Sequence, residues 1–188
     1  MMVLKRFACA SSGKDFESHD EEHLSKLFSR SNEYFQTLKE GISLCTAARI
    51  EIKNGVEVDV GAQTELATIK MIRKLSKSPD EYLTIRAETE QNILKTNPFS
   101  SERKKSSIII ARPDGKMRVY VIGAPDFIVK FCDSSLDLDL NIHKFGKVET
   151  ENFLKIQEEM ASFVLRTLSI AFRDFEDESL VEAVDKNN

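Results

Sequence analysis

Residues 97–132 read NPFSSERKKSSIIIARPDGKMRVYVIGAPDFIVKFC, and the hairpin within this stretch sets the predicted architecture. Two β-rich runs, 106–112 and 116–122, flank Pro-Asp-Gly at 113–115. A short turn containing glycine between two such runs predicts a β-hairpin. After a Gly-Ala turn, residues 124–132 have the pattern of a helix. The segment therefore predicts two antiparallel strands followed directly by a helix.

An aromatic residue and a basic cluster precede this hairpin. Phe99 is followed by Arg103, Lys104 and Lys105. An aromatic face can stack on another flat ring, and neighbouring cations can meet phosphate. The alternative is an exposed charged turn beside a core phenylalanine, and composition alone favours that alternative.

Three features at element ends weigh against the alternative. Glu65 opens a predicted helix after a loop that contains glycine. Gly123-Ala124 lies where a strand turns into a helix, and Arg166 lies where a helix gives way to a strand. Residues that bind ligands are found preferentially at such ends.

The overall composition excludes several classes of protein. The chain has 188 residues, enough for one large domain, with 41% hydrophobic and 31% charged residues and a net charge of −4. An acidic balance argues against a general nucleic-acid binder. No apolar run approaches a membrane span, so no direct membrane insertion is expected. Cys9, Cys45 and Cys132 are odd in number and far apart, which favours reduced thiols.

The N-terminal part is predicted to be a strand, a loop and a long helical segment. Residues 2–9 read as a strand, 11–22 as a polar loop, and a helical pattern begins at Glu22, with Gly41 as a plausible break. Its apolar stripe consists of Leu24, Leu27, Phe28, Phe35, Leu38 and Ile42.

Turn and cap signals organise the next part of the chain. Residues 50–60 predict a short hairpin around Asn54-Gly55. Thr64 is expected to cap a helix that ends near Leu75. Residues 78–81, Ser-Pro-Asp-Glu, predict a capping box with the proline at the first helical position.

The remaining C-terminal elements complete an α+β fold with a twisted antiparallel sheet flanked by helices. We expect a polar surface excursion at 133–148, a helix at 151–165 and a strand at 167–175. The helix would carry Phe153, Ile156, Met160 and Phe163 on one apolar face. Residues 1–175 should form a single domain, and 176–188 an acidic, frayed tail or hinge segment.

A metal site is considered and set aside. His19 and His23 are four residues apart and would share a helix face, as two metal ligands do. No third ligand is evident, so a solvated acidic segment is the preferred interpretation and no metal site is predicted.

Four motifs in a fixed order carry a resemblance to a known family. They are Gly61-Ala62-Gln63-Thr64-Glu65-Leu66-Ala67, Pro98-Phe99-Ser100-Ser101 followed by Arg103-Lys104, Gly123-Ala124-Pro125-Asp126, and Leu165-Arg166-Thr167-Leu168 with Ala171-Phe172-Arg173-Asp174. The chain resembles the nucleotide-binding domain of P-type cation-transporting ATPases, and the calcium pumps of the plasma-membrane type in particular.

The resemblance implies an ATP site. Its residues would be Glu65, Phe99, Lys104, Gly123, Ala124 and Arg166. Phe99 would stack on the adenine ring and Glu65 would accept a hydrogen bond from the adenine amino group. Lys104 and Arg166 would approach the phosphates. Gly123 would let the backbone lie close to the ligand.

One position departs from the family pattern, and one motif is absent. The family has lysine before Gly-Ala, where this chain has Ile122, and that lysine lines the inner part of the nucleotide pocket. The phosphorylated motif Asp-Lys-Thr-Gly-Thr does not occur in the sequence. The chain would therefore bind ATP with Mg²⁺ without turnover and contains no catalytic residue.

The resemblance also implies a setting. The chain would be an excised cytoplasmic domain of an integral membrane pump that couples ATP hydrolysis to ion translocation. It would work beside the phosphorylation and actuator domains and present the γ-phosphate to an aspartate on the phosphorylation domain. The alternatives are a degenerate interaction domain that binds no nucleotide, and a pump for a cation other than Ca²⁺.

Overall fold

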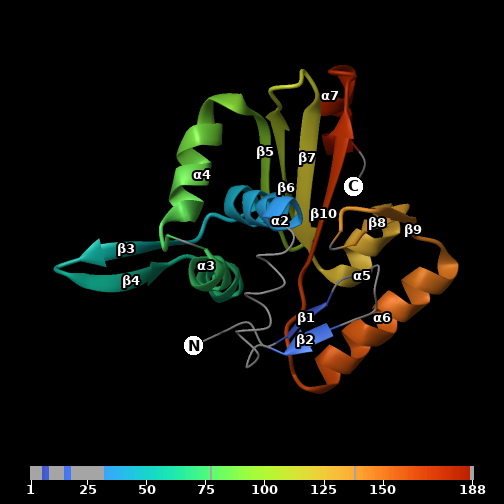
Figure 1. Cartoon of the computed structure of the whole chain (residues 1–188), viewed down its shortest axis with the longest axis horizontal. Helices are drawn as coiled ribbons and strands as arrows, with labels where there is room; N and C mark the ends of the chain where they lie inside the picture. The colour runs from blue at the N-terminus through green and yellow to red at the C-terminus, as the bar shows by residue number, and fades with distance from the viewer. Residues whose placement is uncertain (1–5, 9–14, 18–31, 77, 138, 187–188) are drawn as a thin grey trace.

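A four-stranded antiparallel sheet is the central element of the structure, which is a computed structural model (Figure 1). The strand order is β10-β7-β6-β5, so the predicted hairpin β6–β7 lies in the middle. The strands are β5 Ile93–Ser100, β6 Lys105–Ala111, β7 Met117–Gly123 and β10 Ser169–Phe175. All neighbouring pairs are antiparallel and helices flank the sheet, which confirms the predicted α+β fold.

The structure describes residues 6–8, 15–17, 32–76, 78–137 and 139–186. Near the N-terminus, β1 Arg6–Ala8 pairs with β2 Asp15–Glu17. The strand expected at 2–9 is confirmed where it is described, whereas the loop expected at 11–22 is wrong at β2. Both histidines of the rejected metal site, His19 and His23, lie outside the described residues. So do Leu24, Leu27 and Phe28 of the apolar stripe.

Helix α2, Asn32–Cys45, packs on one face of the sheet through the described part of that stripe. Phe35, Leu38 and Ile42 are buried, as predicted. Gly41 does not break the helix, because α2 continues through it to Cys45. A Cβ atom there would lie 2.6 Å from Cδ1 of Ile170, so the glycine instead allows the helix to approach the sheet closely.

The strand β5 has no counterpart among the predicted elements. It contains a charged residue, Lys95, and a proline, Pro98, which are both rare in central strands. Because β5 is an edge strand, Pro98 needs no partner for the N–H that it lacks. Pairing with β6, not local propensity, holds this segment extended.

Next to the sheet lie a hairpin and two helices. They are β3 Arg49–Lys53, β4 Val56–Val60, α3 Gln63–Leu75 and α4 Glu81–Thr89, followed by the 3₁₀ turn η1 Glu90–Asn92. Lys53 faces Val56, so Asn54-Gly55 forms the two-residue turn that was predicted. Figure 1 shows this hairpin projecting away from the sheet.

Both predicted helix caps are wrong in detail. Helix α3 begins one residue before Thr64, and Ala62 is its N-cap, whose carbonyl accepts from the N–H of Leu66 at 2.9 Å. The side chain of Thr64 is therefore available for a different hydrogen bond, which is described below. Helix α4 begins at Glu81 with Asp80 as N-cap and no side-chain cap bond, so the expected capping box does not form.

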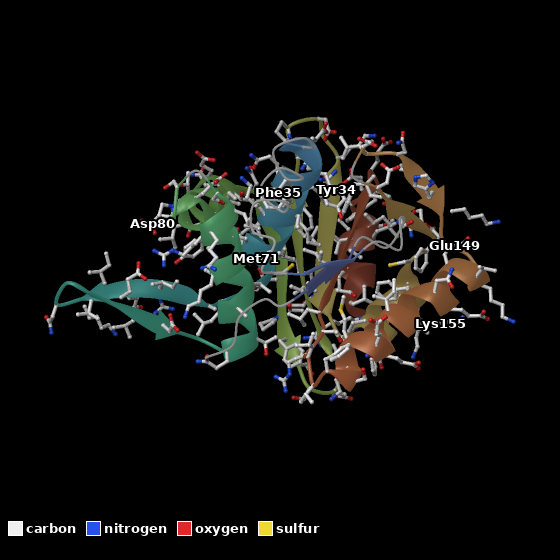
Figure 2. All side chains as sticks on the ribbon, turned by 60° about the horizontal axis from the view of Figure 1, so that its bottom comes forward. Tyr34, Phe35, Met71, Asp80, Glu149 and Lys155 are labelled. Carbon is white, nitrogen blue, oxygen red and sulfur yellow. The ribbon has the colours of Figure 1, made fainter. Side chains whose placement is uncertain are left out.

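The chain after β7 forms a second group of elements. It comprises α5 Pro125–Ile128, the 3₁₀ turn η2 Val129–Phe131, β8 Ser134–Leu136, β9 Ile142–Lys144 and α6 Lys147–Ser162. The helix predicted at 124–132 is thus split into an α-turn and a 3₁₀ turn. Both views place α3, with Met71, and α6, with Glu149 and Lys155, on opposite sides of the sheet (Figures 1 and 2).

Two expectations for this region need correction. The surface excursion at 133–148 contains the β8–β9 hairpin, whose turn is held by Asp137. Its Oδ1 accepts from the N–H groups of Asp139 at 2.9 Å and Asn141 at 2.8 Å. In α6, Phe163 follows the last helical residue and is 63% exposed, so it is not part of the apolar face of the helix.

The acidic C-terminal segment is not frayed over its described part. Residues Ser179–Lys186 form helix α7, which begins where Oδ1 of Asp177 accepts from the N–H of Ser179 at 2.9 Å. Nζ of Lys95 in β5 donates to the carbonyl of Val181 at 3.3 Å. A tertiary contact with the sheet edge therefore holds a segment that looked like a linker.

The hydrophobic core lies between the sheet and α2, α3 and α4. Its members include Leu66 and Ile72 of α3, Tyr82 of α4, and Tyr120 and Ile122 of β7. This core orients the ends of α3 and β7 relative to each other, and those ends carry two of the residues predicted to bind nucleotide, Glu65 and Gly123.

Candidate functional site

One row of residues crosses all four strands at the same end of the sheet. Ser100 of β5 is opposite Lys105 of β6, Lys105 is opposite Gly123 of β7, and Gly123 is opposite Ser169 of β10. Neighbouring strands lie about 4.8 Å apart, so this row is compact. Among the predicted site residues, Gly123 is in the row, Phe99, Lys104 and Ala124 adjoin it in sequence, and Arg166 lies three residues before Ser169.

Phe99 is a surface residue. Its side chain is 55% exposed on β5, so the alternative that it belongs to the core is wrong. After it, the chain makes a tight turn in which Nη2 of Arg103 donates to the carbonyl of Pro98 at 2.7 Å. The arrangement leaves an aromatic face exposed beside a guanidinium group.

Lys104, Gly123 and Ala124 form one junction. The N–H of Ala124 donates to the carbonyl of Lys104 at 3.0 Å, and Lys104 has a left-handed φ of 55°. A Cβ atom on Gly123 would lie only 2.4 Å from that carbonyl oxygen. Packing against the neighbouring strand thus already requires glycine here, and a role in approaching a ligand stays a prediction.

Arg166 reaches the start of α3. Its Nη1 donates to Oγ1 of Thr64 at 3.0 Å, across 102 residues of sequence. Arg166 follows the end of α6, where Val164 has a φ of 58° and donates its N–H to Ala161 at 2.8 Å. The turn directs the chain from α6 toward β10. The side chain of Arg166, which follows the turn, extends toward α3.

Glu65 makes structural hydrogen bonds. Its Oε2 accepts from the N–H groups of Ala47 and Ala48, each at 3.1 Å. In the first turn of α3 this carboxylate also suits the positive end of the helix dipole. The proposed contact of Glu65 with adenine remains a prediction.

Ile122 stands where the family pattern has lysine, and in this structure it is a core residue. It is 7% exposed and pairs with Ser106 on one side and Ile170 on the other. Its side chain belongs to the same apolar cluster as Tyr120. An apolar residue here is therefore explained by packing.

A hollow of about 1410 Å³, as bounded by the described residues, extends along β7 and β10 from this end of the sheet as far as Asp174. Its walls include Thr64, Lys105, Ile122, Arg166 and Leu168. Of the predicted site residues, Arg166 lines the hollow, whereas the others lie outside its lining. The site is thus a sheet end that opens onto a large depression, and not a closed pocket.

Lys105 is a further cation of this site, which belongs to the predicted basic cluster but is not among the predicted ATP-site residues. Its Nζ lies 4.2 Å from the ring centroid of Phe131, and both residues line the hollow. Burial, and then the charge of Arg103, lower the pKa of Lys105. The sequence places Lys105 in a basic cluster, but its contact with Phe131 depends on the fold.

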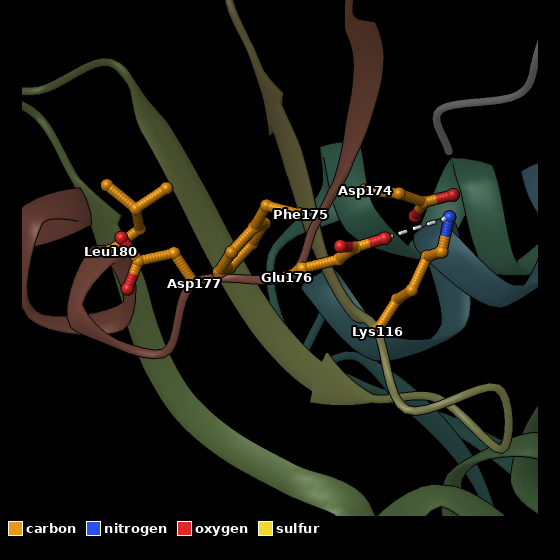
Figure 3. A pocket seen from close by; sticks show the side chains of 6 residues that line it. All are labelled: Lys116, Asp174, Phe175, Glu176, Asp177 and Leu180. Atoms are coloured by element: carbon orange, nitrogen blue, oxygen red, sulfur yellow. Dashed lines mark ion pairs between the residues drawn. The ribbon is translucent and has the colours of Figure 1, made fainter.

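The opposite end of the sheet has a different chemistry. A smaller hollow of about 380 Å³ is lined by Asp174, Glu176 and Asp177 together with Lys116 (Figure 3). Nζ of Lys116 lies 3.4 Å from Oε1 of Glu176, so its charge is matched within the hollow. The acidic lining disfavours phosphate, which leaves the end at Gly123 as the better candidate.

The residues that the structure describes contain no group of three or more His, Cys, Asp or Glu side chains arranged to hold a metal ion. Among the same residues, no helix combines the length and apolarity needed to cross a membrane.

Residues 34–188 match the family model described as P-type ATPase, cytoplasmic domain N. The chain is 33% identical over 144 residues to plasma membrane calcium-transporting ATPase 4 of Bos taurus, covering 73% of this chain and 12% of that protein. It is 31% identical over 142 residues to the probable calcium-transporting ATPase 9, plasma membrane-type, of Oryza sativa subsp. japonica, covering 75% and 13%. The chain therefore spans about an eighth of the length of these relatives.

Proposed function

Because this chain belongs to the family of P-type ATPase cytoplasmic N domains, we propose that it is the ATP-binding domain of an ATP-driven calcium pump. The match covers most of the sequence and includes each predicted site residue. The relatives are named as calcium-transporting ATPases, and this is the support for Ca²⁺ as the transported ion.

The observation that carries the proposal is the convergence at one end of the sheet. An exposed aromatic ring, Phe99, lies beside the row that joins Ser100, Lys105 and Gly123. Lys104 sits in the adjoining turn and Arg166 lines the adjoining hollow. A ring for stacking and cations for phosphate are the two requirements for binding ATP.

In this role the chain binds and orients the nucleotide. Phe99 stacks on the base, Glu65 reads its amino group, and Lys104 and Arg166 contact the phosphates. The phosphates bring their own Mg²⁺ as part of the substrate. Catalysis by the pump depends on positioning: this domain presents the γ-phosphate to an aspartate on the phosphorylation domain, beside the actuator domain. The chain would then be a cytoplasmic part of an integral membrane protein.

A titration of the chain with MgATP, followed by two-dimensional NMR, tests the proposal. The amide signals of Phe99, Lys104 and Arg166 should shift together with one dissociation constant. Signals around Lys116 at the acidic end of the sheet provide the internal control and should stay in place. Shifts confined to the acidic end, or no shifts at millimolar ATP, would contradict the proposal.

One observation favours the alternative of a degenerate interaction domain. Ile122 replaces the family lysine and is packed in the core, so that cation is missing from the site. This alternative predicts that the same titration shows no saturable shifts. The two proposals are therefore separated by one experiment.

A further inference from the structure

Arg86 of α4 donates several hydrogen bonds to the end of α2 and to the turn that follows it. No local sequence pattern predicts these bonds. Its Nε donates to the carbonyl of Ser43 at 2.7 Å. Its Nη2 donates to the carbonyl of Thr46 at 2.6 Å, to the hydroxyl of Thr46 at 3.1 Å and to the carbonyl of Ala48 at 3.0 Å. The planar fork of arginine suits several carbonyls that converge in this way.

The same turn is held from its other side by Glu65. The N–H groups of Ala47 and Ala48 both donate to Oε2 of Glu65 at 3.1 Å. Ala48 is completely buried, with its carbonyl bonded to Arg86 and its N–H to Glu65. The backbone of the turn 46–48 is therefore hydrogen-bonded to the guanidinium of Arg86 on one side and to the carboxylate of Glu65 on the other.

Helix α4 gives Arg86 a rigid base. Tyr82, one turn earlier, is fully buried, and its hydroxyl accepts from the N–H of Ile50 at 3.0 Å. The guanidinium carbon of Arg86 lies 5.2 Å from the centroid of the Tyr82 ring. Among the described residues Arg86 forms no ion pair, so its charge is directed at the carbonyl end of α2, where the helix dipole is negative.

We propose that Arg86 is a positioning residue for base recognition, which acts through the turn 46–48 to orient the carboxylate of Glu65. This inference rests on the proposed function, in which Glu65 accepts from the adenine amino group. With Oε2 fixed by two backbone donors, Oε1 is the oxygen left to accept from a ligand. When the turn loosens, Glu65 loses its fixed rotamer and the reading of the amino group weakens.

The test compares two nucleotides that differ at one group. Inosine triphosphate carries a carbonyl where ATP carries its amino group, and both have the same phosphates and ring size. The readout is the ratio of the two dissociation constants, measured by calorimetry at one salt concentration. The wild-type chain should prefer ATP, and Glu65→Gln should abolish the preference.

Arg86→Lys is the main variant, because lysine keeps the charge but cannot reach all the carbonyls. We expect its preference for ATP to fall by roughly tenfold, as for the loss of a hydrogen bond to a charged group. Affinity for inosine triphosphate should change by less than about twofold, because stacking and phosphate contacts remain. The double variant with Glu65→Gln should lose no more preference than Glu65→Gln alone.

Two further variants keep the test decisive. Thr46→Val removes the hydroxyl that accepts from Arg86 and leaves the backbone bonds, so a smaller loss of preference is expected even if Arg86→Lys does not fold. Arg73→Gln is the matched control. It removes an arginine that contacts Glu57 on the β3–β4 hairpin, at 2.6 Å, and should leave the preference unchanged.

The outcomes separate the two proposals. A wild-type chain that binds neither nucleotide would overturn the proposed function and this inference with it. If Glu65→Gln abolishes the preference while Arg86→Lys and Thr46→Val keep it, only the inference is wrong. Equal weakening of both nucleotides by Arg86→Lys would show a merely structural role and would also overturn it.

Discussion

Individual side chains at the sheet end give the sharpest tests, and Phe99 is the first. Base stacking on an aromatic ring is worth about 1–3 kcal/mol, so Phe99→Ala should weaken ATP binding by roughly 5- to 150-fold. The melting temperature should hardly change, since the ring is 55% exposed. Ile52→Ala on β3 is a control, because it removes another exposed apolar side chain, on the hairpin that projects away from the sheet. A large fall in melting temperature with ATP binding intact would assign Phe99 a structural role instead.

Ile122 is the second side chain that gives a test. For this residue the structure changes the expectation. The sequence alone predicts that Ile122→Lys strengthens ATP binding, by roughly tenfold, through a charge-assisted hydrogen bond. The residue is buried in the core but also lines the hollow, so the lysine must extend its ammonium into that hollow. We therefore expect tighter ATP binding together with a loss of about 1–3 kcal/mol in unfolding free energy.

Calorimetry and thermal melts on the same samples check both parts of this prediction. Ile122→Met serves as the control, since it keeps an apolar side chain of similar size and should alter neither quantity much. A folded Ile122→Lys chain that binds ATP no better than wild type would place this position outside the ATP site.

Among the elements, the end of α6 contains a residue in an unfavourable conformation. Val164 has a φ of 58°, and the N–H of Leu165 donates to the carbonyl of Met160 at 3.2 Å, which is the pattern of a Schellman cap. A β-branched residue is costly there, and Val164 is 93% exposed, so its side chain contributes little packing. Val164→Gly should stabilise the chain by about 0.5–1 kcal/mol.

Urea denaturation of matched variants measures this effect. Val148→Gly, in the first turn of the same helix, exchanges the same two residue types at a site that is 63% exposed and has an ordinary helical conformation. This control should lose stability, by about 0.5–1 kcal/mol, because glycine is a poor helix former. Loss of stability in both variants would show that the cap is not strained.

The β8–β9 hairpin provides a prediction on pH. The hydrogen bond from His143, at 2.7 Å, and those from Asn141 and Asp139 lower the pKa of Asp137 to about 2. A carboxylate with a lowered pKa in the folded state stabilises it above its unfolded pKa and loses that effect as the pH falls through the folded one. The hairpin should therefore loosen between about pH 4 and pH 2.

NMR signals of Asp137 and of the strand amides report this transition directly. In Asp137→Asn the hairpin should no longer respond to pH in that window, because the side chain cannot titrate. An Asp137 carboxyl that titrates near pH 4 would show that the contacts with His143 and the turn are not formed in solution.

For the molecule as a whole, the central prediction is ATP binding without turnover. The sequence lacks Asp-Lys-Thr-Gly-Thr, so no acceptor carboxylate of that kind is present in the chain. Incubation with MgATP labelled on the γ-phosphate should give no acid-stable phosphoenzyme and no measurable phosphate release. A labelled acyl phosphate that hydroxylamine removes would refute this prediction, and heat-denatured chain provides the background.

Elements with strong local signals could be predicted from the sequence. The β6–β7 hairpin, the β3–β4 hairpin around Asn54-Gly55, and α3 up to Leu75 all match, because turn chemistry and apolar periodicity act over a few residues. Phe99, Lys104 and Arg166 could be named in the same way, because short motifs carry them.

The parts that could not be predicted depend on contacts between distant residues. The edge strand β5 is held by its ladder with β6, and α7 contacts β5 through Lys95 and Val181. In the site, Arg166 contacts Thr64 across 102 residues, and Arg86 reaches the turn after α2 across about 40.

The same physical reason explains both the success and the failure. A turn or a cap is stabilised by atoms within one or two turns of chain, so its energy can be read locally. By contrast, Ile122 becomes buried only when the sheet and helices pack together. The same is true of the hydrogen bonds from Arg86 to the turn 46–48. The motif residues alone therefore indicate the ligand class that we propose, and the packed fold determines which other side chains contact them.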